Sequence, residues 1–284
     1  MNTTEKQAIQ EQLRNYVAKF SSQNKAANSL KDISSATVSQ ILNDNWEKVS
    51  DEMWRKVDKQ TRLTPQGWVT VETSAFKLIT KLIGDAQQFS NVLAITGGAG
   101  SGKSVAIKQY SNENKNAILL QCSEFWNRKY FLAELLSQMG RDYSGLTVSE
   151  MMQESIRVIQ TLENPVIILD EADKLTDQVL YFFITLYNHL EDHCGIVLLA
   201  TDHLAKRIRK GMKLNRKGYN EIYSRIGRKF IELKGTNYTD VTQVCMANGV
   251  ADKAKIEQIF KDAEGDLRRV KRLIHADKMK QQAA

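Results

Sequence analysis

The chain has 284 residues, of which 42% are hydrophobic and 26% charged, with two prolines and three cysteines. This composition excludes collagen-like, low-complexity and disulfide-scaffold proteins. Apolar runs such as 166–169 and 196–200 are far shorter than the roughly 20 residues of a membrane span, so we expect no membrane-spanning segment. The N-terminus lacks a signal-peptide pattern, and an odd number of widely spaced cysteines favours a reducing, cytoplasmic compartment.

Charge is spread unevenly along the chain. The formal net charge is +7, but residues 1–64 carry +2, residues 65–202 carry −6 and residues 203–284 carry +11. A strongly basic C-terminal third predicts a polyanionic partner, which is either nucleic acid or an anionic membrane surface. A solvated helical surface is the alternative.

The first segment of the chain, residues 5–60, shows apolar spacing typical of helices and no alternation typical of strands. Residues 23–43 resemble a helix-turn-helix, with the small Ala27 where the helices approach and Ser34 or Ser35 as cap of the second helix. The side chains expected on the exposed face of that helix are neutral: Ser35, Thr37, Ser39, Gln40 and Asn43. Gln40 and Asn43 are candidate DNA contacts, and a protein-docking module is the alternative.

A proline and a glycine in residues 63–67 interrupt the helical pattern and indicate a linker. Beyond it, short β-branched runs alternate with helical patterns, which predicts a parallel sheet covered on both faces, an α/β core of three layers (αβα). After residue 235 only helices are expected. The predicted domains are 1–62, 63–235 and 236–284. Expected strands are 92–96, 117–121, 166–170, 196–201 and 229–233; expected helices are 103–113, 128–139, 147–161, 176–192, 239–247, 253–263 and 266–278.

Between the first strand and the next helix lies a complete G-x-x-x-x-G-K-[ST] motif, the phosphate-binding P-loop. Its glycines allow backbone N–H groups to surround phosphates, and the helix N-terminus adds a favourable dipole. Lys103 would neutralise the β- and γ-phosphates of ATP, and the Ser104 hydroxyl would ligate Mg²⁺. The candidate nucleotide-binding residues are Gly97, Gly98, Ala99, Gly100, Ser101, Gly102, Lys103, Ser104 and Val105.

The apolar strand 166–170 ends in two adjacent carboxylates, Asp170 and Glu171. Parallel sheets bind their ligands at the carboxyl ends of the strands. Asp170 is therefore a candidate Mg²⁺ ligand, and Glu171 is a candidate base for the water that attacks the γ-phosphate. An acidic capping turn without catalytic function is the alternative for this pair alone.

These motifs resemble those of the AAA+ ATPases, and the resemblance implies further site residues. Thr201 lies where the family has its sensor 1 residue, often Asn, which leaves the assignment open between Thr201 and Asp202. Segment 222–228 is similar to the motif that supplies an arginine finger to a neighbouring subunit, with Arg225 the first candidate and Arg228 the second. Arg268 corresponds to sensor 2. Solvated cations are the alternative for these arginines.

Nearly the whole chain resembles the transposition protein B type of phage Mu, target-capture ATPases related to the insertion-sequence helper ATPases. The resemblance rests on the helix-turn-helix, residues 167–173, the Tyr-Ser-Arg-Ile segment and a short lid. It implies a bacterial or mobile-element protein that forms a filament or ring on duplex DNA, largely without sequence preference, and delivers DNA to a transposase. A helicase loader and a nucleotide-gated operator-binding regulator are the alternatives.

Two further segments are candidate DNA contacts. Seven of the twelve residues in 206–217 are basic, which predicts a loop that tracks a phosphate backbone; a solvated loop is the alternative for both segments. Arg128 and Lys129, after the second strand, lie where such ATPases commonly contact DNA. The candidates in 206–217 are Lys210, Lys213, Arg216 and Lys217. His189, His193 and Cys194 lack a second ligand pair, so we expect no zinc site.

Overall fold

The sheet of this protein forms from five short apolar segments. The computed structural model describes residues 1–18, 20, 22–61 and 68–283, and within them the strands pair in the order β2-β3-β4-β1-β5, all parallel. Every residue of β3 and β4 is buried, as expected for central strands covered on both faces. The strands are β1 (Val92–Thr96), β2 (Ala117–Gln121), β3 (Val166–Asp170), β4 (Gly195–Ala200) and β5 (Ile231–Glu232).

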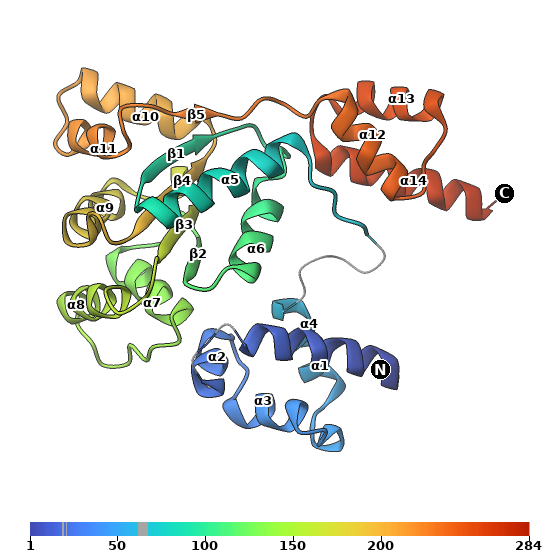
Figure 1. The fold of residues 1–284 in the computed structure, drawn as a ribbon, viewed down its shortest axis with the longest axis horizontal. Coiled ribbons are helices and arrows are strands. Elements are labelled where there is room, and N and C mark those ends of the chain that lie inside the picture. The colour runs from blue at the N-terminus through green and yellow to red at the C-terminus, as the bar shows by residue number, and fades with distance from the viewer. Residues whose placement is uncertain (19, 21, 62–67, 284) are drawn as a thin grey trace.

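Side chains alternate across the sheet, so two separate cores form. In β3, Val166 and Ile168 pack with helices α5 (Ser74–Phe89) and α6 (Lys103–Glu113) on one face. Ile167 and Leu169 pack on the other face. The helices of that second face are α7 (Arg128–Gln138), α8 (Val148–Ile159), α9 (Asp177–Leu190), α10 (Asp202–Lys213) and α11 (Tyr219–Arg225). The predicted α/β fold with a parallel sheet is confirmed (Figure 1).

The N-terminal unit, residues 1–61, has its own apolar core around Leu13 and Trp54. In α3, the hydroxyl of Ser34 accepts a hydrogen bond from the backbone of Thr37 and so caps the helix. The helices are α1 (Thr3–Val17), α2 (Gln23–Ser29), α3 (Ser35–Leu42), η1 (Trp46–Lys48) and α4 (Asp51–Thr61). The predicted linker at 63–67 and the boundary at 62 lie outside the described residues.

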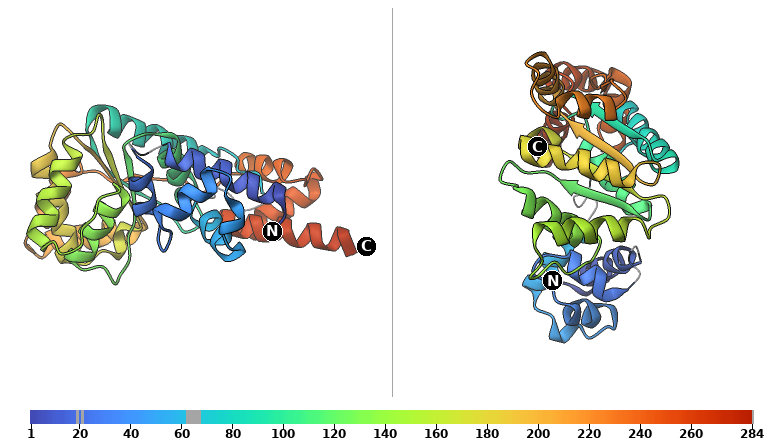
Figure 2. Two further views of the ribbon diagram at one scale, coloured as in Figure 1. Left: turned by 90° about the horizontal axis from the view of Figure 1, so that it is seen from below. Right: turned by 90° about the vertical axis from the view of Figure 1, so that its left-hand side faces the viewer.

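The N-terminal unit contacts the α/β core beside the edge strand β2 (Figure 2). Gly140, after α7, approaches the backbone of Lys25 so closely that a Cβ at Gly140 would overlap it. The ammonium of Lys31 lies 3.4 Å from the carboxylate of Glu134 on α7. These contacts leave a cleft between the unit and the core.

The C-terminal unit follows β5 at the opposite edge of the sheet and consists of α12 (Tyr238–Ala247), α13 (Lys253–Ala263) and α14 (Leu267–Ala283). Two sets of hydrogen bonds join this unit to segment 68–74. The side chain of Asn248 both donates to the carbonyl of Val69 (3.0 Å) and accepts from its N–H (2.9 Å). The carboxylate of Asp240 accepts bonds from the backbone N–H and hydroxyl of Ser74. Segment 68–74 and the C-terminal unit are thereby tied together.

The expectation of a basic loop at 206–217 is wrong for residues 206–213, which belong to α10. A helix forms here because Leu204, Ala205 and Ile208 bury one side of it while the basic residues occupy the other. Arg207 is not free for DNA, because it donates to the carbonyl of Leu175 (2.6 Å) and pairs with Asp177. No helix among the described residues is long and apolar enough to cross a membrane.

Candidate nucleotide-binding site

The loop between β1 and α6 adopts the backbone conformations that its glycines allow. Gly100 has φ +74° and Gly102 has φ +87°, which is the left-handed region that other residues enter at a cost. Any Cβ at Gly100 would overlap the carboxylate of Asp266, just before α14. The N–H of Leu267 donates to the carbonyl of Gly100 (2.9 Å), so the C-terminal unit rests directly on the P-loop.

Lys103 lies at the first turn of α6 and folds back over this loop. Its ammonium donates to the carbonyl oxygens of Gly97 (2.7 Å) and Gly98 (2.8 Å). Burial lowers the pKa of Lys103, and the carboxylates of Asp170 and Asp173 partly oppose that shift. Phosphate oxygens are stronger, charged acceptors for this ammonium than neutral carbonyls, so the geometry suits a phosphate ligand.

Ser104 and Asp170 bring two oxygen ligands together at the end of β3. The Ser104 hydroxyl donates to a carboxylate oxygen of Asp170 at 2.8 Å, and Asp170 is only 2% exposed. Burial raises the pKa of Asp170, while the bond from Ser104 acts in the opposite direction. A hydroxyl beside a carboxylate fits Mg²⁺, which usually takes few protein ligands and completes its shell with phosphate oxygens and water.

Glu171 follows with φ +55°, an uncommon conformation for a residue with a side chain. Its carboxylate accepts a bond of 2.8 Å from the ammonium of Lys174. The hydroxyl of Thr201, at the start of α10, donates to Asp173 (2.8 Å). Thr201 lines the cavity described next, whereas the alternative, Asp202, is not among the lining residues.

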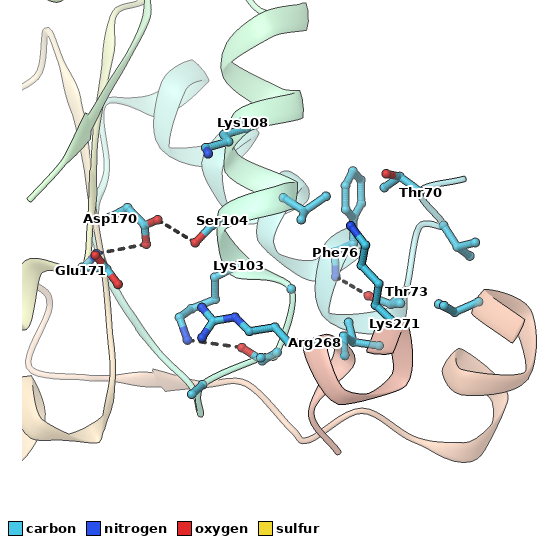
Figure 3. Close-up of a pocket in the computed structure, with 18 of the residues that line it drawn as sticks. Thr70, Thr73, Phe76, Lys103, Ser104, Lys108, Asp170, Glu171, Arg268 and Lys271 are labelled. Carbon is cyan, nitrogen blue, oxygen red and sulfur yellow. Dashed lines mark hydrogen bonds between the residues drawn. The ribbon is translucent and has the colours of Figure 1, made fainter. Parts of the chain in front are cut away.

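These groups line a cavity of about 460 Å³ between the P-loop, the strand ends and the C-terminal unit. Figure 3 shows Lys103 and Arg268 reaching toward the same part of it. On the side of segment 68–76 the wall is largely apolar, and the ammonium of Lys271 lies 5.1 Å from the ring of Trp68. The lining residues that the sequence analysis missed include Trp68, Val71, Phe76, Val244, Leu267 and Lys271.

The two candidate arginine fingers lie outside this cavity, on and after α11. The guanidinium of Arg225 lies over the ring of Tyr187 at 4.7 Å and donates to the side chain of Asn188 at 3.1 Å. Arg228 is exposed, with φ +57°. No group of three or more His, Cys, Asp or Glu residues forms a metal site in the described ranges.

The candidate DNA contacts do not form one surface. Arg128 and Lys129 are exposed at the start of α7, which packs on β2, whereas α10 packs near β1 toward the other edge of the sheet. Gln40 and Asn43 belong to the separate N-terminal unit, and the amide of Asn43 donates to Ser39 (3.1 Å). The exposed basic candidates on α10 and its following turn are Lys210, Lys213, Arg216 and Lys217.

A parallel sheet in this order, with a P-loop after β1 and an acidic pair after β3, gives the chain an AAA+ P-loop α/β fold. Residues 87–208 match the model of an AAA domain family. The chain resembles the Mu-like prophage FluMu DNA transposition protein B of Haemophilus influenzae, with 23% identity over 254 residues, 83% of this chain and 84% of that protein. The resemblance predicted from the sequence is confirmed at this level.

Two solved structures align with parts of this chain. AMPPCP-bound DnaA from Aquifex aeolicus aligns with a TM-score of 0.49 and 16% identity, covering 74% of this chain and 64% of that chain. ATP-bound NtrX from Brucella abortus aligns with a TM-score of 0.49 and 12% identity, covering 86% of this chain and 59% of that chain. The chain thus spans less than two thirds of either protein.

Proposed function

We propose that this protein is an ATP-dependent ATPase that assembles on duplex DNA, largely without sequence preference, and delivers that DNA to a transposase. The observation that carries the proposal is the Ser104–Asp170 pair at the mouth of a cavity that the P-loop and the C-terminal unit enclose. The name of the H. influenzae relative, a DNA transposition protein, supports the transposition role because that alignment spans most of both chains.

In this proposal the triphosphate of ATP binds along the P-loop, and the positive charge of the Lys103 ammonium pairs with the phosphates. Ser104 and Asp170 hold Mg²⁺, which neutralises phosphate charge when it is bound. Glu171 accepts the proton of the attacking water, and Arg268 contacts the phosphates from the C-terminal unit. The apolar wall with Trp68 receives the base.

Hydrolysis further requires a neighbouring subunit, because neither candidate finger lines the cavity of its own chain. Arg225 is the first candidate: its stack on Tyr187 restricts the guanidinium at the surface of α9 and α11, where a neighbour could bind. Arg228 is the second candidate. The subunits would form a filament or ring on DNA, so that each supplies a guanidinium to the next site.

Duplex DNA would contact the exposed basic side of α10 and the start of α7. Phosphate contacts from lysine and arginine carry no sequence information, which agrees with binding that has little preference. The helix pair α2 and α3 presents neutral side chains and would contribute weakly, through the multivalency of an assembly.

The decisive experiment is to image the protein on a long duplex with ATP, ADP or a nonhydrolysable ATP analogue, with Lys103→Ala protein as control. We expect extended assemblies with ATP and the analogue, fewer with ADP and none with the control. Nuclease footprinting on the same DNA should show no preferred sequence. A single protected sequence would favour the operator-binding regulator, and absence of DNA binding in every nucleotide state would contradict the proposal.

A further inference from the structure

Strand β2 forms one edge of the sheet, because it pairs only with β3. The N–H of Cys122 donates to the carbonyl of Asp170 on β3 (2.9 Å), and the carbonyl of Asn116 accepts a bond from Val166 (3.1 Å). Along a strand the N–H and C=O of one residue point to the same side, and the sides alternate from residue to residue. The even-numbered residues therefore face β3. The backbone groups that face outward belong to Ala117, Leu119 and Gln121.

This edge lacks the features that usually protect an edge strand. Within the ranges that the structure describes, the outward N–H and C=O groups of β2 make no hydrogen bond. Proteins commonly protect such an edge with charged residues, with proline or by making the strand very short. At the opposite edge of the sheet β5 has only two residues, whereas β2 has five, and none of them is charged or a proline. Strand β2 is therefore a template on which a further strand could pair.

Open space borders β2 on the side of the N-terminal unit. The cleft, with a volume of about 650 Å³, is lined by Leu119 and Gln121. A second cleft of about 480 Å³ is lined by Ala117 and Leu119. Tyr16 of α1 lines both clefts from the opposite side. The two clefts together thus extend along the whole of β2.

Both clefts are basic, although residues 65–202, which include β2, carry a net charge of −6. Four lysines and two glutamates line the cleft, and two lysines, one arginine and one glutamate line the second cleft. The two glutamates of the cleft, Glu134 and Glu171, each already pair with one of its lysines. The excess of positive charge favours an acidic ligand.

We propose that β2 is a docking site for an extended acidic segment of a partner protein, which adds to the sheet as a sixth strand while its carboxylates contact the basic residues of the two clefts. A peptide supplies N–H donors and C=O acceptors at the spacing of the outward groups of β2. A DNA phosphate accepts hydrogen bonds but donates none, so it would leave the outward carbonyls without partners. This inference goes beyond the proposed function and does not depend on ATP hydrolysis.

The probe is a fluorescein-labelled octapeptide of alternating Glu and Val, titrated with the full chain and followed by fluorescence anisotropy. We expect saturable binding that weakens as the salt concentration rises, because the peptide and the clefts carry opposite charge. The matched octapeptide of alternating Lys and Val should not bind. Absence of binding by the acidic peptide, or equal binding by both peptides, would overturn the inference.

Leu119→Pro tests the pairing of the backbones. It removes one outward N–H and leaves the hydrogen bonds to β3 in place, and edge strands tolerate proline. We expect the affinity for the acidic peptide to fall about five-fold or more, whereas Leu119→Val keeps the N–H and should stay within about two-fold of the wild type. Equal affinity of the two variants would show that the peptide does not pair with β2. If a circular dichroism melt shows that Leu119→Pro does not fold, Gln121→Pro, with Gln121→Ala as control, makes the same comparison at an exposed side chain.

Lys59→Glu tests the contribution of charge from the N-terminal unit. It should weaken binding of the acidic peptide several-fold, whereas Lys48→Glu, at an exposed lysine of the same unit outside both clefts, should not. If Lys59→Glu instead weakens binding of a mixed-sequence duplex and leaves peptide binding unchanged, the cleft binds DNA and the inference is wrong. If Leu119→Pro abolishes self-association in analytical ultracentrifugation, the occupant is a second copy of this chain, which contradicts the inference as well.

Discussion

The basic surface on α10 and its following turn allows a quantitative test of DNA binding. Its four candidate contacts are exposed and make no ion pair within the described residues: Lys210, Lys213, Arg216 and Lys217. Each is therefore free to neutralise one DNA phosphate, and each neutralised phosphate contributes about −0.9 to the slope of log affinity against log salt. Replacing all four with Gln should flatten the slope by up to about 3.6. Over a four-fold rise in salt, the wild type should then lose about 150-fold more affinity than the variant does.

The assay is fluorescence anisotropy of a labelled duplex, titrated with protein and ATP at a series of salt concentrations. Binding should weaken alike for all duplex sequences, because phosphate contacts carry no sequence information. As a control, Gln40→Ala with Asn43→Ala should leave the slope nearly unchanged, because these side chains are neutral. The fold should survive the four substitutions, since the residues that bury α10 are untouched.

One result would refute this reasoning. If the four substitutions leave affinity and slope intact while substitutions of Arg128 and Lys129 abolish binding, the basic side of α10 is only solvated. DNA would then pass along the start of α7. A circular dichroism melt of every variant separates loss of contacts from loss of structure.

Further predictions concern the nucleotide site. Lys103→Ala should abolish ATP binding, measured with a fluorescent analogue, and DNA binding with it, whereas normal DNA affinity would disprove their coupling. Glu171→Gln should retain ATP and trap assemblies on DNA, and rapid turnover by it would show that the base is misassigned. Mixing Arg225→Ala with Lys103→Ala protein should restore part of the ATPase activity, and failure at every ratio would move the finger to Arg228. Without nucleotide, Asp170→Asn should melt at a higher temperature than the wild type, because burial raises the pKa of Asp170 and penalises its charged form. The difference in melting temperature should grow as pH rises above about 4 and vanish at lower pH. A difference that does not change with pH would contradict this explanation.

Much of the core could be predicted because its signals are local. Strands β1, β2 and β3 have the predicted bounds, since continuous apolar runs flanked by polar residues are typical of buried parallel strands. The P-loop is equally local, because Gly100 and Gly102 are needed for the backbone itself. Helix α10 was missed although Leu204 and Ile208 are spaced for a helix, because the density of positive charge suggested a solvated loop.

The rest of the site depends on contacts between segments distant in sequence. Trp68 lies in a segment without a motif. It lines the cavity because the next residue, Val69, is hydrogen-bonded through its backbone to Asn248, which lies 179 positions further along the sequence. The pairing of Glu171 with Lys174 requires a 3₁₀ turn and a left-handed residue, which a strand pattern does not predict. Likewise, the ring of Tyr187 beneath Arg225 follows from the packing of α11 on α9.

The positions of the tryptophans make the two cavities separately visible to spectroscopy. The chain has four tryptophans, and Trp68 lines the nucleotide cavity while Trp126 lines the cleft. Trp46 and Trp54 pack against each other in the core of the N-terminal unit, with ring centroids 5.7 Å apart, and provide a constant background. Replacing either Trp68 or Trp126 with Phe leaves the other as reporter. The intrinsic fluorescence of the unlabelled protein can thus report on each cavity separately.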